Sequence, residues 1–340
     1  MRKSPSLSQA ATEALFKLAL IAMLLLALVL TGCGQSESAT NQSATEPGGK
    51  KLSVVTTIFP PYDFTRQIVG DKAEVTMLLP PASESHSFEP TPQDIIKIQN
   101  CDVFVYVGGE SDQWVNEVLE SMDTSHMKVI TLMDCVEVRE EEIVEGMEEE
   151  EEEADETGGA EAEEVEYDEH VWTSPRNAML ITQKISDALC ALDTENAGTY
   201  QSNTVAYLTK LKELDAAFTQ VTAEASRKTI VFGDRFPFRY FTDAYGLDYF
   251  AAFPGCSTET EANAATVKFL IDKINAEKIP VVFHIELSNE KMADTIAEAT
   301  GAKVRLLHAC HNISKEDFQA GRTYLDLMSG NVEALKEALD

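Results

Sequence analysis

Four side chains in this sequence are of the types that bind divalent transition metals. His86 lies in residues 80–92, PPASESHSFEPTP, a loop rich in Pro, Ser and Glu that cannot bury an imidazole in a core. His170 follows a long acidic stretch, and Asp234 and Glu286 end two apolar, strand-like segments. Neutral imidazole nitrogens and carboxylate oxygens together suit zinc, manganese or iron. The four residues therefore predict a metal centre.

Each of these residues has an ordinary structural interpretation as well. An exposed histidine is commonly inert, and an acidic residue at a strand end is commonly a cap or a surface charge. His284 is two residues from Glu286 on the same strand and could face the same way, but a histidine inside a strand is usually packed. We interpret His308 and His311 as loop residues and His126 as a surface residue. Only the combination favours metal binding.

Strand-like and helical segments alternate along both halves of the chain, which predicts an α/β fold with two lobes. We expect each lobe to be a parallel-type sheet flanked by helices, with residues 51–193 in the first lobe and 227–340 in the second. In residues 194–226, apolar side chains recur at spacings of three and four without a proline, as one continuous helix requires. This predicts a long rigid helix that joins the lobes. Loops at the carboxyl ends of parallel strands form a crevice, where all four candidate ligands are expected.

The formal net charge of −31 is concentrated in one segment. Residues 137–169 hold 19 acidic residues against one arginine, a net of −18 that leaves −13 for the rest of the chain. Residues 137–168 are expected to form a disordered, solvated loop, because such a segment repels itself. Two functions are compatible with this acidic loop, weak cation capture and simple solubilisation. No basic patch of the kind that nucleic acid requires is apparent.

The first fifty residues predict export and membrane anchoring. Basic residues precede the apolar run LALIAMLLLALVL, which is followed by Leu30-Thr31-Gly32-Cys33, a match to the bacterial lipobox. We expect residues 1–33 to be a lipoprotein signal with a lipidated Cys33, and polar residues 34–50 to be a flexible tether. The mature protein is then expected on the extracytoplasmic face of a bacterial cell membrane.

Several stretches together resemble the zinc- and manganese-binding solute-binding lipoproteins of bacterial ABC importers (cluster A-I). They are residues 54–94, which contain His-Ser-Phe-Glu-Pro-Thr-Pro, DEHVWTSPRNA, the region from the strand IVFGD to YFTDAYGL, and VVFHIELSNEKMADTIAEATGAKV. The resemblance implies two lobes joined by a long helix, a monomer, and one divalent cation passed to an ABC permease in the cytoplasmic membrane. It also implies ligand roles for His86, His170 and Glu286.

The sequence departs from the family pattern at the third ligand. Zinc-type members usually carry a histidine and manganese-type members a glutamate after the strand that here reads IVFGD, whereas this chain offers Gly233, Asp234 or Arg235. Asp234 is assigned the role because it alone of the three binds cations. Zn²⁺ is the expected ion, with Mn²⁺ as the alternative, because an added oxygen ligand shifts preference towards manganese.

Five cysteines other than Cys33 leave an odd number for pairing. An extracytoplasmic setting permits a disulfide, and the loop-like positions of Cys256 and Cys310, together with the family resemblance, make them the candidate pair. Cys190 has the spacing of a small buried helical residue, and Cys101 and Cys135 are either paired or buried.

A transport receptor is the leading functional hypothesis, and the protein is not expected to be an enzyme. Four protein ligands close the coordination sphere, whereas a hydrolytic zinc site keeps a position open for water. The motif HExxH is absent from the sequence. The alternatives are an extracellular metallohydrolase, with Glu286 or Glu89 as its base, and an adhesin or structural lipoprotein.

Overall fold

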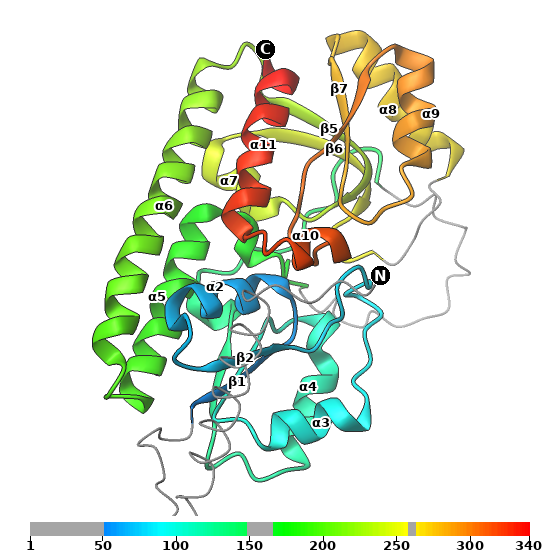
Figure 1. The fold of residues 1–340 in the computed structure, drawn as a ribbon. Coiled ribbons are helices and arrows are strands. Elements are labelled where there is room, and N and C mark those ends of the chain that lie inside the picture. Colours follow the sequence, from blue (N-terminus) through cyan, green and yellow to red (C-terminus); the bar gives the residue numbers. More distant parts are fainter. Residues whose placement is uncertain (1–50, 148–165, 258–262) are drawn as a thin grey trace, which may run out of the picture. The chain divides into compact units, whose positions relative to one another are not determined.

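The computed structural model of the protein describes residues 51–147, 166–257 and 263–340 (Figure 1). Residues 50–340 form one compact unit. The predicted signal segment, Cys33 and the tether lie outside the described residues. Among the described helices, none is long and apolar enough to cross a membrane.

The first sheet contains four parallel strands in the order β2-β1-β3-β4. The strands are β1 (Ser53–Thr56), β2 (Glu74–Met77), β3 (Val103–Tyr106) and β4 (Lys128–Thr131). The helices of this half are α2 (Phe59–Val69), α3 (Pro92–Gln99) and α4 (Gln113–Glu120), with short 3-10 turns at η1 (Glu110–Asp112) and η2 (Met133–Cys135). Helix α3 begins where it does because the Thr91 side chain accepts a hydrogen bond from the Asp94 amide, in a capping box that precedes the helix.

The second sheet repeats this arrangement, with four parallel strands in the order β6-β5-β7-β8. Its strands are β5 (Thr229–Phe236), β6 (Asp248–Pro254), β7 (Val281–His284) and β8 (Lys303–Leu306). Its helices are α7 (Arg239–Tyr245), α8 (Ala264–Glu277) and α9 (Lys291–Thr300). The β5–β6 register shifts between Phe232 and Arg235, where Gly233 packs so tightly on α9 that a Cβ atom would lie 2.6 Å from Ala293 Cα.

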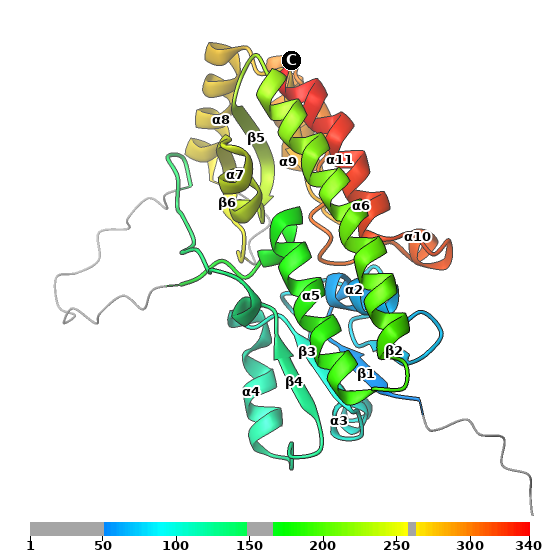
Figure 2. The same cartoon turned by 90° about the vertical axis from the view of Figure 1, so that its left-hand side faces the viewer.

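Four more helices and a 3-10 turn link and cover the sheets. They are η3 (Val171–Thr173), α5 (Pro175–Leu192), α6 (Ala197–Glu224), α10 (Lys315–Gln319) and α11 (Tyr324–Leu339). Figure 2 shows α6 running beside α5 and α2 at one end and beside α11 at the other. Asn203 of α6 donates to the Ile68 carbonyl of α2 at 2.9 Å, and Phe218 packs edge-on against Phe241 of α7. The predicted long helix is thus present and packs on elements of both halves.

One apolar core extends through both halves of the unit. Phe59, Phe64 and Phe104 are among the largest buried side chains of the first half, and Phe232 and Phe283 are among those of the second. Phe59 and Phe232 belong to the same buried cluster, which α6 also joins through Leu211 and Phe218. The predicted α/β class with two sheets flanked by helices is therefore confirmed.

The two ends of the acidic segment are packed, contrary to the expectation of a fully solvated loop. Glu140 pairs with Tyr167 in an antiparallel bridge, and the Arg139 amide donates to the Tyr240 hydroxyl of α7 at 3.1 Å. Met147 is buried against the core, and Asp168 is 1% exposed. The prediction is wrong for these ends because their backbone groups and their few apolar side chains find partners on the second half. The remainder, residues 148–165, lies outside the described residues.

Candidate metal centre

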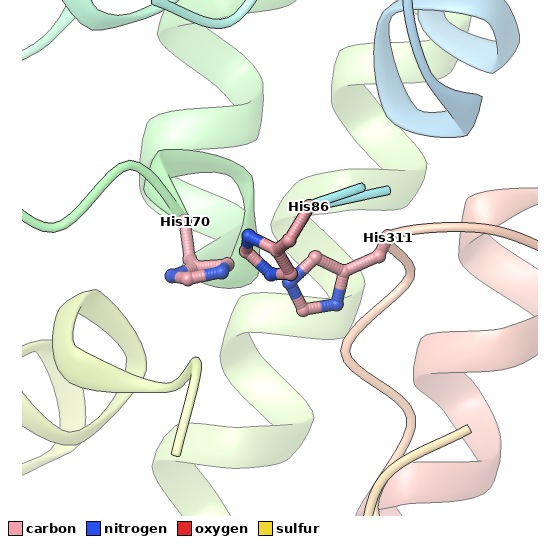
Figure 3. A group of neighbouring side chains, drawn as sticks. All are labelled: His86, His170 and His311. Carbon is pink, nitrogen blue, oxygen red and sulfur yellow. The ribbon is translucent and has the colours of Figure 1, made fainter. Parts of the chain in front are cut away.

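Three histidines from distant parts of the sequence meet in the structure (Figure 3). His86 lies in the loop after β2, His170 immediately precedes η3, and His311 lies in the loop after β8. Their ring centroids are 5.6 Å apart for His86 and His170, 5.3 Å for His86 and His311, and 4.6 Å for His170 and His311. One ligand nitrogen from each ring lies within 4.8 Å of the other two.

The Nε2 atoms of these three imidazoles are buried and have no hydrogen-bond partner among the described residues. Burying a polar nitrogen without a partner costs about 1–3 kcal/mol, so three such atoms at one place call for an explanation. Neutral imidazole nitrogens are the preferred ligands of zinc and related borderline cations. A single cation would satisfy all three atoms at once, so the residues present fit a metal ion.

The opposite nitrogen of each ring, Nδ1, faces a buried carboxylate. Such a partner fixes the ring orientation and tautomer and makes Nε2 a better metal ligand. The contacts are His170 Nδ1 to Asp168 Oδ1 at 3.1 Å, His311 Nδ1 to Glu286 Oε1 at 3.5 Å, and His86 Nδ1 to Ser111 Oγ at 2.8 Å, with Glu169 Oε1 at 3.4 Å from His86 Nδ1.

Helix α11 positions the loop that carries His311. The Asn331 side chain accepts from the His308 amide at 2.7 Å and donates to the His308 carbonyl at 2.8 Å. From the other side, Trp172 Nε1 donates to the Ala309 carbonyl at 2.7 Å. Cys310 adopts a left-handed backbone conformation with φ of 63°, which is uncommon for a residue with a Cβ atom. These bonds hold a strained bend that points His311 at the other two rings.

The loops of His86 and His311 are bonded directly to each other. Asn312 Nδ2 donates to the carbonyls of Pro80 at 2.8 Å and Ser83 at 2.7 Å. The Ala82 amide donates to the Ile313 carbonyl at 2.8 Å. The two histidines therefore sit on one connected pair of loops, although more than two hundred residues separate them in the sequence.

Glu286 lies behind His311 and remains anionic. Its carboxylate accepts from the Ala309 amide at 2.7 Å and the His311 amide at 2.8 Å. Burial raises the pKa of this carboxyl, but the nearby imidazoles of His308 and His311 and the Ala309 amide outweigh burial and lower the pKa to about 2. The carboxylate of Glu286, which the sequence predicted as a ligand, thus contacts the His311 imidazole and two main-chain amides.

The electrostatics of the other residues also favour a bound cation. Burial raises the pKa of Glu169, but hydrogen bonding and charge from His86 and His170 lower it to about 2. Burial lowers the pKa of His170, whereas Asp168, Glu169 and Glu141 together raise it above its usual value. His311 behaves in the opposite way: burial and the neighbouring His170 lower its pKa to about 4. Three buried carboxylates around three imidazoles give the site a negative potential.

Asp234, the predicted third ligand, lies outside the three-histidine group. Its carboxylate accepts from the amides of Arg235 at 2.9 Å and Ile285 at 3.1 Å, and so ties β5 to the end of β7. Arg235 next to it forms an ion pair with Glu84 at 3.1 Å. The structure instead brings His311, which the sequence interpretation treated as a loop residue, beside His86 and His170. Its position after the last strand of a parallel sheet was the signal that could have identified it.

The other histidines have different surroundings. His284 Nδ1 lies 3.0 Å from the Ile285 carbonyl, and His308 Nδ1 accepts from the Cys310 amide at 3.0 Å. His126 is exposed and lies 3.0 Å from the Gln99 carbonyl. The interpretation of His126 as a surface residue agrees with the structure.

The predicted disulfide between Cys256 and Cys310 is not formed, and both thiols are free in the described part of the chain. Cys310 is fully buried, with its sulfur turned towards the His308 carbonyl. Cys256 follows β6 and belongs to a second group of metal-binding side chains, with Glu169 and His170. The Cys310 sulfur thus faces the His308 carbonyl, whereas the Cys256 sulfur lies beside Glu169 and His170. The two sulfurs are therefore in different environments.

A small cavity adjoins the site. It has a volume of about 20 Å³ and is lined in part by Ser111, Glu169, Trp172 and His311. That volume corresponds to roughly one water molecule. Beside the imidazoles, the described part of the chain thus has room for about one water molecule.

Two parallel sheets joined by a long helix, with a buried imidazole cluster where loops of both halves meet, define a two-lobed metal-binding protein. Comparison with known families agrees: residues 54–338 match the family model "Zinc-uptake complex component A periplasmic" (ZnuA). The chain belongs to the ZnuA family.

Two relatives and one solved structure illustrate the similarity. The zinc-binding lipoprotein AdcA of Streptococcus pneumoniae strain R6 is 32% identical over 324 residues, which are 95% of this chain and 61% of that protein. The high-affinity zinc uptake system protein ZnuA of Bacillus subtilis strain 168 is 33% identical over 312 residues, covering 92% of this chain and 94% of the relative. The crystal structure of the Zn(II)-bound ZnuA-like domain of Streptococcus pneumoniae AdcA superposes with a TM-score of 0.69 at 31% identity, covering 85% of this chain and 99% of that domain. The chain thus spans about three fifths of the length of the AdcA relative.

Proposed function

We propose that this protein is an extracytoplasmic receptor that captures Zn²⁺ and delivers it to an ABC permease for uptake. The observation that carries this proposal is the convergence of three buried, unpartnered Nε2 atoms from His86, His170 and His311. Three imidazoles favour zinc over manganese, which prefers oxygen ligands. Membership of the ZnuA family and similarity to zinc-uptake and zinc-binding proteins support the same conclusion.

His86, His170 and His311 are the proposed ligands. Asp168, Glu169 and Glu286 orient them, and Glu286 takes this supporting role in place of direct ligation. When bound, zinc is cargo, and the protein residues hold it through their neutral imidazole nitrogens. Lipidation of Cys33 as the membrane anchor and a monomeric state complete the proposal.

Capture without catalysis fits the dimensions of the site. A hydrolytic zinc centre needs an open coordination position and space for the reacting part of the substrate. The cavity beside His311 has only about 20 Å³, which leaves no room for a peptide or an ester group. We therefore propose that the protein is a receptor and not an enzyme.

The experiment is metal analysis of a soluble form that begins after Cys33. Elemental analysis of the protein as isolated, followed by competition between Zn²⁺ and Mn²⁺, is expected to show one tightly held zinc ion per chain. Turnover of ester, phosphate or peptide substrates that disappears on chelation would favour the metallohydrolase instead. Failure to bind either metal stoichiometrically would favour an adhesin or structural lipoprotein.

A further inference from the structure

The three histidines leave one position of a tetrahedral zinc ion without a ligand. Protein-bound zinc that is held and not used for catalysis is almost always coordinated by four protein atoms. The carboxylates nearest to the imidazoles have other partners. Asp168 accepts from the His170 amide at 2.7 Å, Glu286 accepts two amides, and Glu169 accepts from the Ser111 amide at 3.1 Å. In Glu169 and Glu286 both carboxylate oxygens are engaged by such partners, so direct ligation by either residue would compete with the contacts that orient the histidines.

Cys256 is a cysteine that lies beside His170 in the described part of the chain. Its sulfur lies within 4.8 Å of a ligand atom of Glu169 and of a ligand nitrogen of His170. His170 belongs to both groups, and it is fully buried with an unpartnered Nε2. The sulfur and an imidazole nitrogen on one tetrahedral zinc lie roughly 3.5 Å apart. The sulfur is therefore close enough to His170 for a rearrangement of the Cys256 side chain to bring both residues onto one ion.

The backbone before Cys256 is built for close approach to His170. A Cβ atom at Gly255 would lie 3.1 Å from both Cε1 and Nδ1 of the His170 ring and 2.9 Å from the Phe236 carbonyl oxygen. A side chain at this position would therefore push the loop away from the histidine. The Cys256 amide donates to Glu141 Oε1 at 3.2 Å, which anchors the loop to the packed end of the acidic segment. These contacts are independent of the thiol and hold the Cys256 backbone near the His170 imidazole.

We propose that Cys256 supplies a thiolate as the fourth ligand of the zinc ion held by His86, His170 and His311. This inference rests on the proposed zinc-receptor function. Zn²⁺ displaces the thiol proton, which passes to solvent, and a Zn–S bond forms without any change of oxidation state. Because thiolate is a soft ligand that manganese binds poorly, the sulfur raises the selectivity of the site for zinc.

X-ray absorption spectroscopy of the zinc-loaded protein tests this directly. The expected result is one sulfur at about 2.3 Å alongside nitrogen ligands at about 2.0 Å. The sulfur signal should be absent from Cys256→Ser and unchanged in Cys190→Ser. Cys190 is a matched control because it is a half-buried cysteine on α5 whose thiol contacts the Ala197 carbonyl at 3.6 Å.

Competition between Zn²⁺ and Mn²⁺ gives a second readout. Cys256→Ser is expected to lower the ratio of zinc to manganese affinity by at least about tenfold, while Cys190→Ser keeps the wild-type ratio. Zinc bound stoichiometrically with only nitrogen and oxygen neighbours, or an unchanged ratio in Cys256→Ser, would overturn the role of Cys256 and leave the receptor function intact. A protein that binds no stoichiometric zinc would overturn the receptor function itself.

Discussion

At the scale of single residues, the metal centre depends on what stands behind each imidazole. A histidine binds a cation only when its free nitrogen is unprotonated and pointed at the ion, and both conditions are set by the partner of the other nitrogen. Asp168, Glu286 and the Ser111–Glu169 pair supply that partner for three different rings. In the proposed site, the acidic residues would therefore act on the metal through the histidines.

His311→Ala tests whether this histidine is a ligand. Removing its Nε2 is expected to weaken zinc binding by more than about 100-fold, which is the upper range for loss of a supporting residue and a lower bound for loss of a ligand. His86→Ala and His170→Ala should show losses of similar size. The measurement is competition with a chelator of known affinity, with His126→Ala as the control because His126 is exposed.

Asp234→Ala tests whether Asp234 is a ligand, as the sequence predicted. Its carboxylate binds the amides of Arg235 and Ile285, so its loss should change zinc affinity much less than His311→Ala does. If instead Asp234→Ala abolished binding while His311→Ala bound zinc like the wild type, the ligand set first suggested by the sequence would be restored.

The sequence indicated two of the three histidines, and the reason is local. His86 lies in a Pro- and Ser-rich loop and His170 beside an acidic run, so neither had a simple place in a core. The ligand role proposed for His311 was not recognised, because His308 and Cys310 beside it suggest a loop without a defined role. His311 turns towards the other two histidines because the backbone bends at Cys310, with φ of 63°, and because Asn331 holds the loop by hydrogen bonds to His308. Neither feature is visible in residue spacing.

At the scale of elements, local patterns were sufficient for the strands and for the long helix. Period-two and period-3.6 repeats arise within a segment, so they can be recognised without tertiary contacts. The helix expected over residues 194–226 is observed as α6 over Ala197–Glu224. The packed ends of the acidic segment could not be foreseen, because their partners, such as Tyr240 and Phe269, lie about a hundred residues away. Long-range contacts therefore determine whether such segments are packed or solvated.

Asn331→Ala tests how α11 supports the metal-binding loop. Asn331 is 2% exposed and makes two hydrogen bonds to the main chain of His308. Leaving those buried groups unpaired is expected to cost about 1–3 kcal/mol in the free energy of unfolding, measured by urea denaturation. Zinc affinity should fall as well, because His311 follows in the same loop.

Ser329→Ala is the matched control for this prediction, because Ser329 is an exposed residue of the same helix. It should leave both the unfolding free energy and zinc binding close to their wild-type values. Equal stability of Asn331→Ala and the wild type would show that α11 does not hold the loop through this side chain.

Arg235→Ala tests a link between the two halves. The Arg235 guanidinium on β5 bonds to Glu84 at 3.1 Å, and Glu84 accepts from the His86 amide at 3.3 Å. Burial raises the pKa of Glu84, but the hydrogen bond and charge of Arg235 lower it to about 2. Because partly exposed ion pairs contribute about 0.2–1 kcal/mol, zinc affinity is expected to fall by no more than about fivefold. The loss should shrink at high salt.

Arg322→Ala is the control for the ion pair. Arg322 pairs with Asp317 of α10 at 2.8 Å, and its side chain is 55% exposed. It should not alter zinc affinity. A loss well above tenfold in Arg235→Ala would mean that Arg235 organises the site more extensively than a single ion pair can.

At the scale of the whole molecule, the three proposed ligands are distributed so that zinc bound by all of them would involve both halves. His86 and His170 belong to the first half of the chain, whereas His311 follows β8 of the second sheet. The core is continuous between the two sheets, and α6 packs on both. An ion held by all three histidines would therefore add a connection between parts that already share one buried core.

This arrangement predicts that zinc raises the thermal stability of the entire unit in a single transition. A ligand that binds only the folded state stabilises it by RT ln(1 + [L]/Kd), about 2.7 kcal/mol at a free zinc concentration of 100 Kd. For a domain of this size the corresponding rise in Tm is roughly 5 °C or more. Differential scanning calorimetry of the metal-free and zinc-loaded protein measures it, and His311→Ala should lose most of the rise. Two separate transitions, with only one shifted by zinc, would contradict the view that the site unites both halves, because the ion would then stabilise one sheet without the other.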